Sequence, residues 1–134
     1  MIPSAGGFLE QDFEIEEQPS LTYRMDMDGD SVRGYADGQE AVKQAVFRIL
    51  STERYRHIIY PWWYGIETID LYGEPVNWVC AELERRITEA LLVDSRITGV
   101  TDFEHDTHVK GVVHTTFRVH TIYGDIKAER EVNI

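Results

Sequence analysis

The sequence predicts an α+β fold: an N-terminal β-hairpin and two main helices that pack on a C-terminal three-stranded antiparallel meander. In two stretches, 37–52 and 75–91, apolar residues recur three and four positions apart, which is the period of an amphipathic helix. After residue 96 the apolar residues recur at every second position, as in a strand with one buried face. Because the helical stretches and the later strands are segregated along the chain, the predicted class is α+β.

The composition is that of a folded domain with a strongly acidic balance. The 134 residues include 43% hydrophobic and 28% charged residues, which is ordinary for a globular chain. The formal net charge of −11 argues against nucleic acid as a partner, because binding phosphates needs a concentrated cationic face. No apolar run approaches the ~18 residues that span a bilayer, so we expect no membrane partner. The single cysteine, Cys80, excludes an intramolecular disulfide.

Residues 1–19 are predicted to form an extended acidic arm that precedes one domain over residues 20–134. Its prolines and glycines discourage regular structure, and its acidic residues repel one another. Large apolar residues, among them Phe8 and Phe13, are interleaved with the acids. The arm therefore either docks on a neighbouring subunit, through Phe8 and Phe13, or forms a tail that lies on its own domain or is frayed.

The domain begins with a predicted hairpin, residues 21–27 and 31–35, joined by a turn at Asp28-Gly29-Asp30. The acids of this turn also resemble the start of a calcium-binding loop. An EF-hand needs glycine at loop position six and glutamate at position twelve, and those positions hold Ser31 and Asp37. We therefore expect a turn without calcium.

The first long helix begins at a predicted capping box, in which Asp37 accepts hydrogen bonds from first-turn amides and Glu40 reaches back. The helix is expected to end at Ser51-Thr52 and to pack on the C-terminal sheet. Its predicted buried stripe comprises Ala41, Val42, Ala45, Val46, Ile49 and Leu50.

Five aromatic residues lie between positions 55 and 64, and Pro61 and Gly65 force this segment into a shaped loop. Tryptophan and tyrosine are enriched at protein interfaces, but they also fill small cores. Adjacent side chains of an extended segment point to opposite sides. We therefore expect one of Trp62 and Trp63 in the core and the other partly exposed, where it contacts a partner.

A short helical turn is predicted over residues 67–71, and Pro75 suits the first turn of the second long helix. Cys80 lies on the apolar stripe of this helix and is interpreted as an inert core thiol. The whole stripe comprises Val76, Val79, Cys80, Leu83, Ile87, Ala90 and Leu91. Ion pairs at i,i+4 spacing are expected on the wet face, Glu82 with Arg86 and Arg85 with Glu89.

The last third is predicted as the meander. Its first strand covers residues 97–104 and is bulged at Gly99, and Gly124-Asp125 is a type II′ turn signal between the second and third strands. The core face of the second strand is expected to carry Val113, Thr115, Phe117, Val119 and Tyr123.

The histidines at positions 105, 108, 114 and 120 have no spacing typical of a zinc site, so we expect no metal and no cofactor. The sequence also has no phosphate-binding glycine loop, no GxSxG and no HExxH motif. Glu53 and Glu67 flank the aromatic segment and are the pair considered for a glycan-cleaving, lysozyme-like site. Arg54 and Arg56 beside Glu53 do not provide the apolar pocket that its acid would need.

Several short motifs follow one another between residues 20 and 131. They are Leu50-Ser51-Thr52-Glu53-Arg54, Pro61, Tyr64-Gly65, Ile87-Thr88-Glu89-Ala90-Leu91, Asp94-Ser95-Arg96-Ile97, Phe117-Arg118-Val119 and Tyr123-Gly124-Asp125-Ile126. In order and spacing they resemble the baseplate wedge family of contractile-tailed phages and related tailocins and secretion machines, and are most similar to its XkdS-like branch in prophage tail clusters.

The resemblance implies a non-enzymatic structural component of an inner baseplate, which helps to start sheath polymerisation. The implied partners are other wedge proteins, hub and tube-initiator proteins and the sheath protein, with multiple copies per particle. The implied location is the virion, after assembly in the host cytoplasm. The alternatives are the small glycan-cleaving enzyme that uses Glu53 and Glu67, and an adaptor protein unrelated to any phage particle.

In that family a Glu-Pro-Arg signature follows the long helix and docks on a helical bundle of other wedge proteins. The matching positions are Asp94, Ser95 and Arg96, so the acid and the arginine are retained in type and the proline is absent. Arg96 either forks onto a partner carboxylate or pairs internally with Asp94. The predicted partner-binding residues are therefore these three together with Trp62, Trp63, Phe8 and Phe13.

Overall fold

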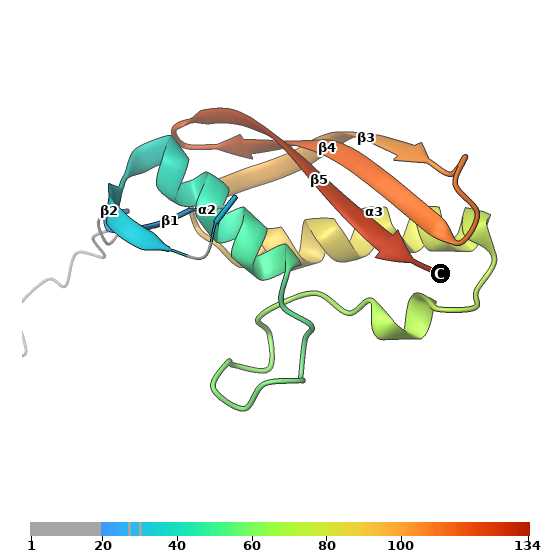
Figure 1. The fold of residues 1–134 in the computed structure, drawn as a ribbon. Helices are drawn as coiled ribbons and strands as arrows, with labels where there is room; N and C mark the ends of the chain where they lie inside the picture. Colours follow the sequence, from blue (N-terminus) through green and yellow to red (C-terminus); the bar gives the residue numbers. More distant parts are fainter. Residues whose placement is uncertain (1–19, 27, 30) are drawn as a thin grey trace, which may run out of the picture.

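The computed structural model describes residues 20–26, 28–29 and 31–134. In this part of the chain a three-stranded antiparallel sheet covers two long helices, and a separate two-stranded hairpin lies at one end (Figure 1). The predicted α+β architecture is therefore confirmed. No helix of the described residues is both long enough and apolar enough to cross a membrane.

The hairpin consists of β1 (Thr22–Met25) and β2 (Val32–Ala36), and one side chain of the first long helix, Gln44, is hydrogen-bonded to β1. Gln44 donates from Nε2 to the carbonyl oxygen of Tyr23 at 2.8 Å and accepts at Oε1 from the amide of Met25 at 2.9 Å. The helical pattern places Gln44 off the apolar stripe, yet it is buried. It is buried because its amide bonds two main-chain groups of β1, and buried main-chain groups need hydrogen-bond partners.

The first long helix, α2 (Gly38–Leu50), begins and ends where the sequence predicts. The carboxylate of Asp37 accepts from the amide of Gly38 at 2.7 Å, and Ser51 is the C-cap. The second half of the predicted capping box does not form, because Glu40 pairs with Arg24 on β1 at 2.9 Å instead. Of the predicted stripe, only Ala45 is less than fully buried.

The second long helix, α3 (Val76–Leu92), follows the short η1 helix (Ile69–Leu71) and has Pro75 as its N-cap rather than in its first turn. Both predicted ion pairs form, Arg86 with Glu82 at 3.0 Å and Arg85 with Glu89 at 3.1 Å. Val76 is exposed and Cys80 is half-buried, contrary to the predicted stripe. Both lie near the start of the helix. The remaining five stripe residues are buried.

The meander contains β3 (Ile97–Asp106), β4 (Val112–Thr121) and β5 (Gly124–Asn133), in the order β3-β4-β5. The predicted irregularity at Gly99 is present, and a second lies between residues 101 and 104. The predicted turn at Gly124-Asp125 is wrong by two residues, since Thr121 pairs with Gly124 and the turn is Ile122-Tyr123.

Two features explain why the turn lies at Ile122-Tyr123. Gly124 has φ +111°, so glycine is needed directly after the turn rather than inside it. Tyr123 is exposed rather than on the core face, and its hydroxyl lies 2.7 Å from the hydroxyl of Ser20. The segment that leads into β1 is thereby attached to the start of β5.

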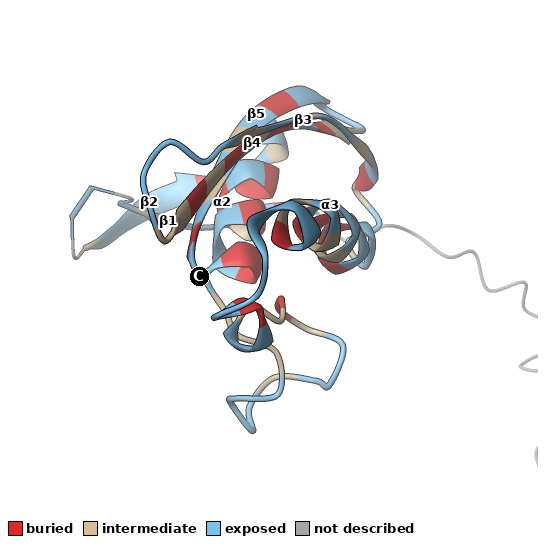
Figure 2. Ribbon diagram, turned by 90° about the vertical axis from the view of Figure 1, so that its right-hand side faces the viewer, coloured by how far each residue is buried: buried red, intermediate tan, exposed pale blue. Residues whose placement is uncertain are grey.

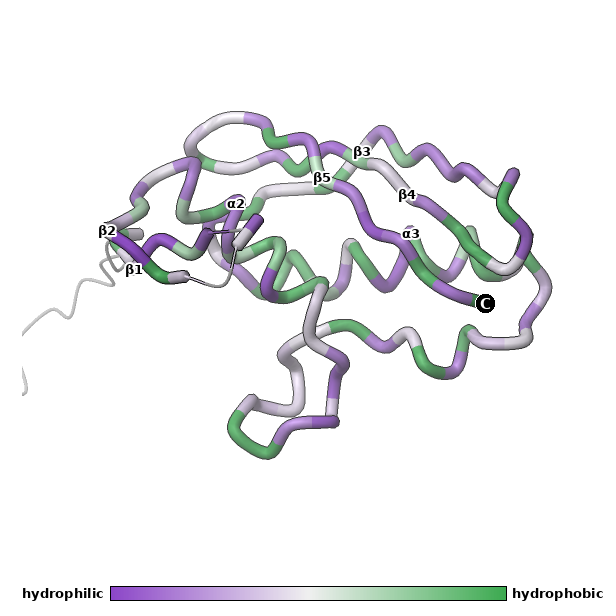
Figure 3. Tube along the Cα trace, in the orientation of Figure 1, coloured by the Kyte–Doolittle hydropathy of each residue, from purple (hydrophilic) through white to green (hydrophobic). Residues whose placement is uncertain are grey.

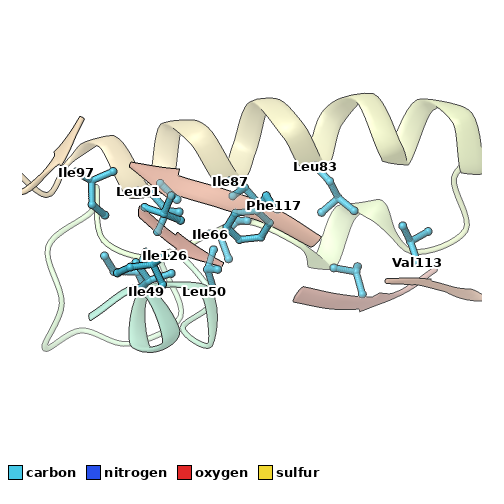
Figure 4. Packing of buried hydrophobic residues seen from close by; sticks show 14 of the residues in the cluster. Ile49, Leu50, Ile66, Leu83, Ile87, Leu91, Ile97, Val113, Phe117 and Ile126 are labelled. Atoms are coloured by element: carbon cyan, nitrogen blue, oxygen red, sulfur yellow. The ribbon is translucent and has the colours of Figure 1, made fainter. Parts of the chain in front are cut away.

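The core lies between the sheet and the helices, where the buried faces of both layers meet (Figure 2). Phe117 of β4 packs among Leu83, Ile87 and Leu91 of α3 and the C-terminal end of α2 (Figure 4). Burial of each such side chain stabilises the fold by about 1.5–3 kcal/mol.

Candidate interaction surface

A loop of residues 55–63, here called the aromatic loop, projects from the body of the domain between α2 and η1 (Figure 1). Its tip is apolar and faces solvent: Ile58 is 102% exposed, Ile59 84% and Trp62 72%. Figure 3 shows this end of the loop as hydrophobic. Contiguous exposed apolar groups of this kind mark interaction sites on soluble domains.

Neither tryptophan enters the core, so the prediction that one of them would is wrong. Trp63 is 42% exposed and meets the ring of Tyr64 edge to face, with 6.4 Å between ring centroids. Tyr64 instead packs against the core and stacks on Tyr60 at 4.7 Å. Adjacent side chains do not point to opposite sides here, because the loop is turned at Pro61 rather than extended.

The aromatic loop is closed at its base by main-chain hydrogen bonds. The amide of Arg54 donates to the carbonyl of Ile66 at 3.1 Å, and the amide of Ile66 donates to the carbonyl of Thr52 at 3.0 Å. The Arg54 guanidinium donates twice to the carbonyl of Gly65, at 3.2 and 3.1 Å. Ile66 itself is buried in the core. The exposed tip therefore stands on a fixed base.

Glu53 holds the two ends of the aromatic loop in place rather than acting in a catalytic pair of carboxylates. Its Oε1 accepts from the amides of Thr68 and Ile69 at 2.8 and 3.1 Å, and its Oε2 lies 2.7 Å from the Thr68 hydroxyl. The carboxylate thus caps η1, whose first amides would otherwise lack partners. Both carboxylate oxygens of Glu53 are therefore engaged in holding the chain.

Glu67, the other member of the candidate pair, lines a small polar cavity of about 200 Å³ among arginines. Arg86 crosses this region and donates to the Glu67 carbonyl, to Glu82 and to Asp70. The hydrogen bond from Arg86 lowers the pKa of Asp70. A glycan-cleaving acid needs an apolar pocket that keeps it protonated, whereas this cavity is polar and lined by arginines.

The corner Asp94-Ser95-Arg96 lies where α3 gives way to β3. The Arg96 guanidinium donates from Nε and Nη2 to the two Asp94 oxygens at 2.9 and 2.7 Å, and the Arg96 amide donates to Oδ1 at 3.0 Å. Burial raises the pKa of Asp94, but these hydrogen bonds and the charge of Arg96 outweigh it, so the pKa is lowered. The internal pair forms, and docking by this corner stays a prediction.

The histidines of the sheet and of the β3–β4 connection each pair with nearby carboxylates. His105 bonds Glu84 at 3.0 Å and Thr115 at 2.9 Å, His120 bonds Asp125, His114 bonds Glu129, and His108 bonds Asp106. Within the described ranges, no three side chains of metal-ligating type gather into one site. Burial, and secondarily the charge of Glu84, raises the pKa of the Cys80 thiol, which disfavours the reactive thiolate.

Phe8 and Phe13 lie outside the described residues. The sequence reasoning missed one exposed aromatic pair, Tyr23 on β1 and Tyr35 on β2, which stack at 5.4 Å. These residues are directly opposed in the hairpin register, so pairing the two predicted strands would have found them. They stay exposed on a two-stranded hairpin that lies apart from the main sheet.

Comparison with known proteins gave two matches. The family described as contractile injection system sheath initiator matches residues 13–124. The chain is also 33% identical, over 129 residues, to the phage-like element PBSX protein XkdS of Bacillus subtilis (strain 168), and the match covers 91% of each chain.

Proposed function

The chain belongs to the contractile injection system sheath initiator family, and from this premise we propose that it is a baseplate wedge component on which the sheath begins. Membership of the family assigns it a structural role in a contractile tail and favours a non-enzymatic protein. The finer proposal is that it docks wedge proteins, hub or tube-initiator proteins and the sheath protein. It does so in several copies per particle, after assembly in the host cytoplasm.

The aromatic loop is the observation that carries this proposal. Ile58, Ile59 and Trp62 leave more apolar surface in water than an isolated domain needs, because the core is already complete without them. Isoleucine and tryptophan anchors of this kind fill pockets on partner proteins, and tryptophan is prominent among interface hot spots. We expect the loop tip to insert into an apolar pocket of a wedge protein.

The base of the loop suits such an anchor. Arg54 and Glu53 hold both strands of the base to the domain, so little freedom is lost when the tip binds. A loose loop of the same composition would lose more conformational entropy on binding. Preorganisation therefore supports docking rather than a passive connection.

The Asp94–Arg96 corner is proposed as a second, weaker contact. Its internal pair fixes the guanidinium plane at a half-buried position between α3 and β3. A partner helix can approach such a fixed cation with its C-terminal carbonyls. In a symmetric particle the loop and the corner act together, since the first contact raises the effective concentration of the second.

The experiment is co-purification of the full chain with its neighbouring wedge proteins. Ile58→Ser and Trp62→Ala, combined in one chain, are expected to weaken retention at least tenfold, because each removes a desolvated anchor. Val109→Ser is the matched control, since Val109 is also exposed but lies in the β3–β4 connection. Equal retention of all three proteins would refute docking through the loop.

A further inference from the structure

A groove of about 680 Å³ runs between α2 and β5. Apolar residues line it from both sides, with Val46, Phe47 and Leu50 on the helix and Ile126 and Ala128 on the strand, and polar or charged residues lie among them. Phe47 is exposed even though it adjoins the core residue Val46. The groove is therefore a partly apolar surface that the described residues leave uncovered.

Arg130 of β5 lines the same groove and is poorly satisfied. Its Nε is buried and has no hydrogen-bond partner among the residues that the structure describes. Burial lowers the pKa of Arg130, against the opposing effect of the charge of Glu53. A buried guanidinium N–H without an acceptor is costly, so a carboxylate supplied from elsewhere would be favourable at Arg130 Nε.

The wall of the groove is also a sheet edge. Among the described residues β5 pairs only with β4, so within that part of the chain one side of its ten residues carries main-chain groups that no strand pairs with. Proteins normally cover or blunt a long edge strand, because it otherwise pairs with other chains. An extended segment in the groove would cover the edge of β5 and would also bring an acceptor to Arg130.

The start of the described chain lies at one end of this groove. Ser20 bonds Tyr123, and Gln39 bonds the carbonyl of Asp125 at 3.0 Å, so the arm joins the domain where both β5 and α2 begin. An arm that lies in the groove and ends there must run from the C-terminal end of β5 toward its start, antiparallel to the strand. At about 3.3 Å per residue, six arm residues span the distance from Ile126 to Glu131.

The arm has the composition that this groove requires. Phe13 and Ile15 alternate with Asp12, Glu14 and Glu16, which is the pattern of a strand with one apolar and one acidic side. The groove offers apolar walls together with Lys43, Lys127 and Arg130. Its two carboxylates, Glu129 and Glu131, both face His114. On a chain of net charge −11, this is a favourable surface for an acidic segment.

We propose that residues 12–17 of the chain's own arm lie extended in the groove between α2 and β5, with an arm carboxylate on Arg130. This assigns Phe13 to the chain's own domain and leaves Phe8 for a partner. It concerns a different surface from the aromatic loop, so either proposal stands or fails without the other.

Amide hydrogen exchange of the full chain tests the proposal. In Phe13→Ser/Ile15→Ser, exchange over residues 126–131 is expected to rise on the order of tenfold, because two buried apolar contacts are lost. Ile58→Ser/Ile59→Ser is the matched control and is expected to leave this stretch unchanged. High salt is expected to raise exchange there in the unmodified chain, and not within β4.

Two results would overturn the proposal. Unchanged exchange over residues 126–131 in Phe13→Ser/Ile15→Ser would show that the arm does not cover the groove. Protection that grows with protein concentration, together with a dimer in sedimentation, would show that the arm of a second copy occupies it instead.

Discussion

The closure of the aromatic loop depends on one glycine. Gly65 has φ +95°, and a Cβ placed there would lie 2.5 Å from the carbonyl oxygen of Thr52 and 3.2 Å from the amide nitrogen of Arg54. Both atoms belong to the main chain, so neither can rotate away. Gly65→Ala therefore forces apart the two strands that hold the loop to the domain.

The cost can be worked out by comparison with Gly73, which has φ +82° and no atom near its added Cβ. Gly73→Ala carries only the penalty for positive φ, about 1 kcal/mol. Gly65→Ala carries the same penalty plus a main-chain clash, which adds about 2 kcal/mol. We expect Gly65→Ala to lower the free energy of unfolding by about 3 kcal/mol in total.

Urea unfolding of the two variants, followed by far-ultraviolet circular dichroism, measures the difference. If Gly65→Ala and Gly73→Ala lower the unfolding free energy equally, the main-chain contact between Gly65 and Thr52 does not constrain the loop. The loop would then not be preorganised for binding.

Three further predictions concern the core and the two carboxylates at the loop base and corner. Leu83→Ala should lower the free energy of unfolding by about 3 kcal/mol in a urea titration, since Leu83 is fully buried in the core. The lowered pKa of Asp94 means that its carboxylate stabilises the fold above its unfolded pKa, near 3.9, and that this stability is lost as pH falls through the folded value. Asp94→Asn should therefore be about 1–2 kcal/mol less stable than the unmodified chain at pH 7, and the difference should vanish once the pH lies below the lowered pKa of Asp94; a difference that stays constant as the pH falls would contradict the assignment. Glu53→Gln should lower the free energy of unfolding by about 1–2 kcal/mol, because it weakens the cap on η1. If the unmodified chain cleared cell-wall glycan and Glu53→Gln did not, the lysozyme-like alternative would be supported.

The regular elements were accessible from the sequence because local signals agreed with one another. Asp37 and Ser51 mark the ends of α2, and the change of period after Arg96 marks the meander. The errors fall where tertiary contacts override a local rule. Gln44 is buried because a strand of the hairpin needs its amide, and the β4–β5 turn is displaced where Tyr123 reaches Ser20.

The interaction surface was only partly accessible. The density of aromatic residues pointed to the loop, but the exposure of Trp63 depends on how Pro61 turns the chain, which no periodicity records. The groove beside β5 could not be predicted, since it depends on the distance between two elements far apart in sequence. Arg130 sits on the core-facing side of its strand, and only the assembled fold reveals that its Nε has no acceptor among the described residues.

The most direct test of the central claim is electron microscopy of tail particles assembled with the loop-tip variant Ile58→Ser/Trp62→Ala in place of the unmodified chain. The tip lies outside the core, so the variant should fold normally, as circular dichroism would verify. We expect particles that lack a sheath, because under the proposed function the loop holds in the baseplate the chain on which the sheath begins. Sheathed tails in normal number, containing the variant chain, would contradict docking through the aromatic loop.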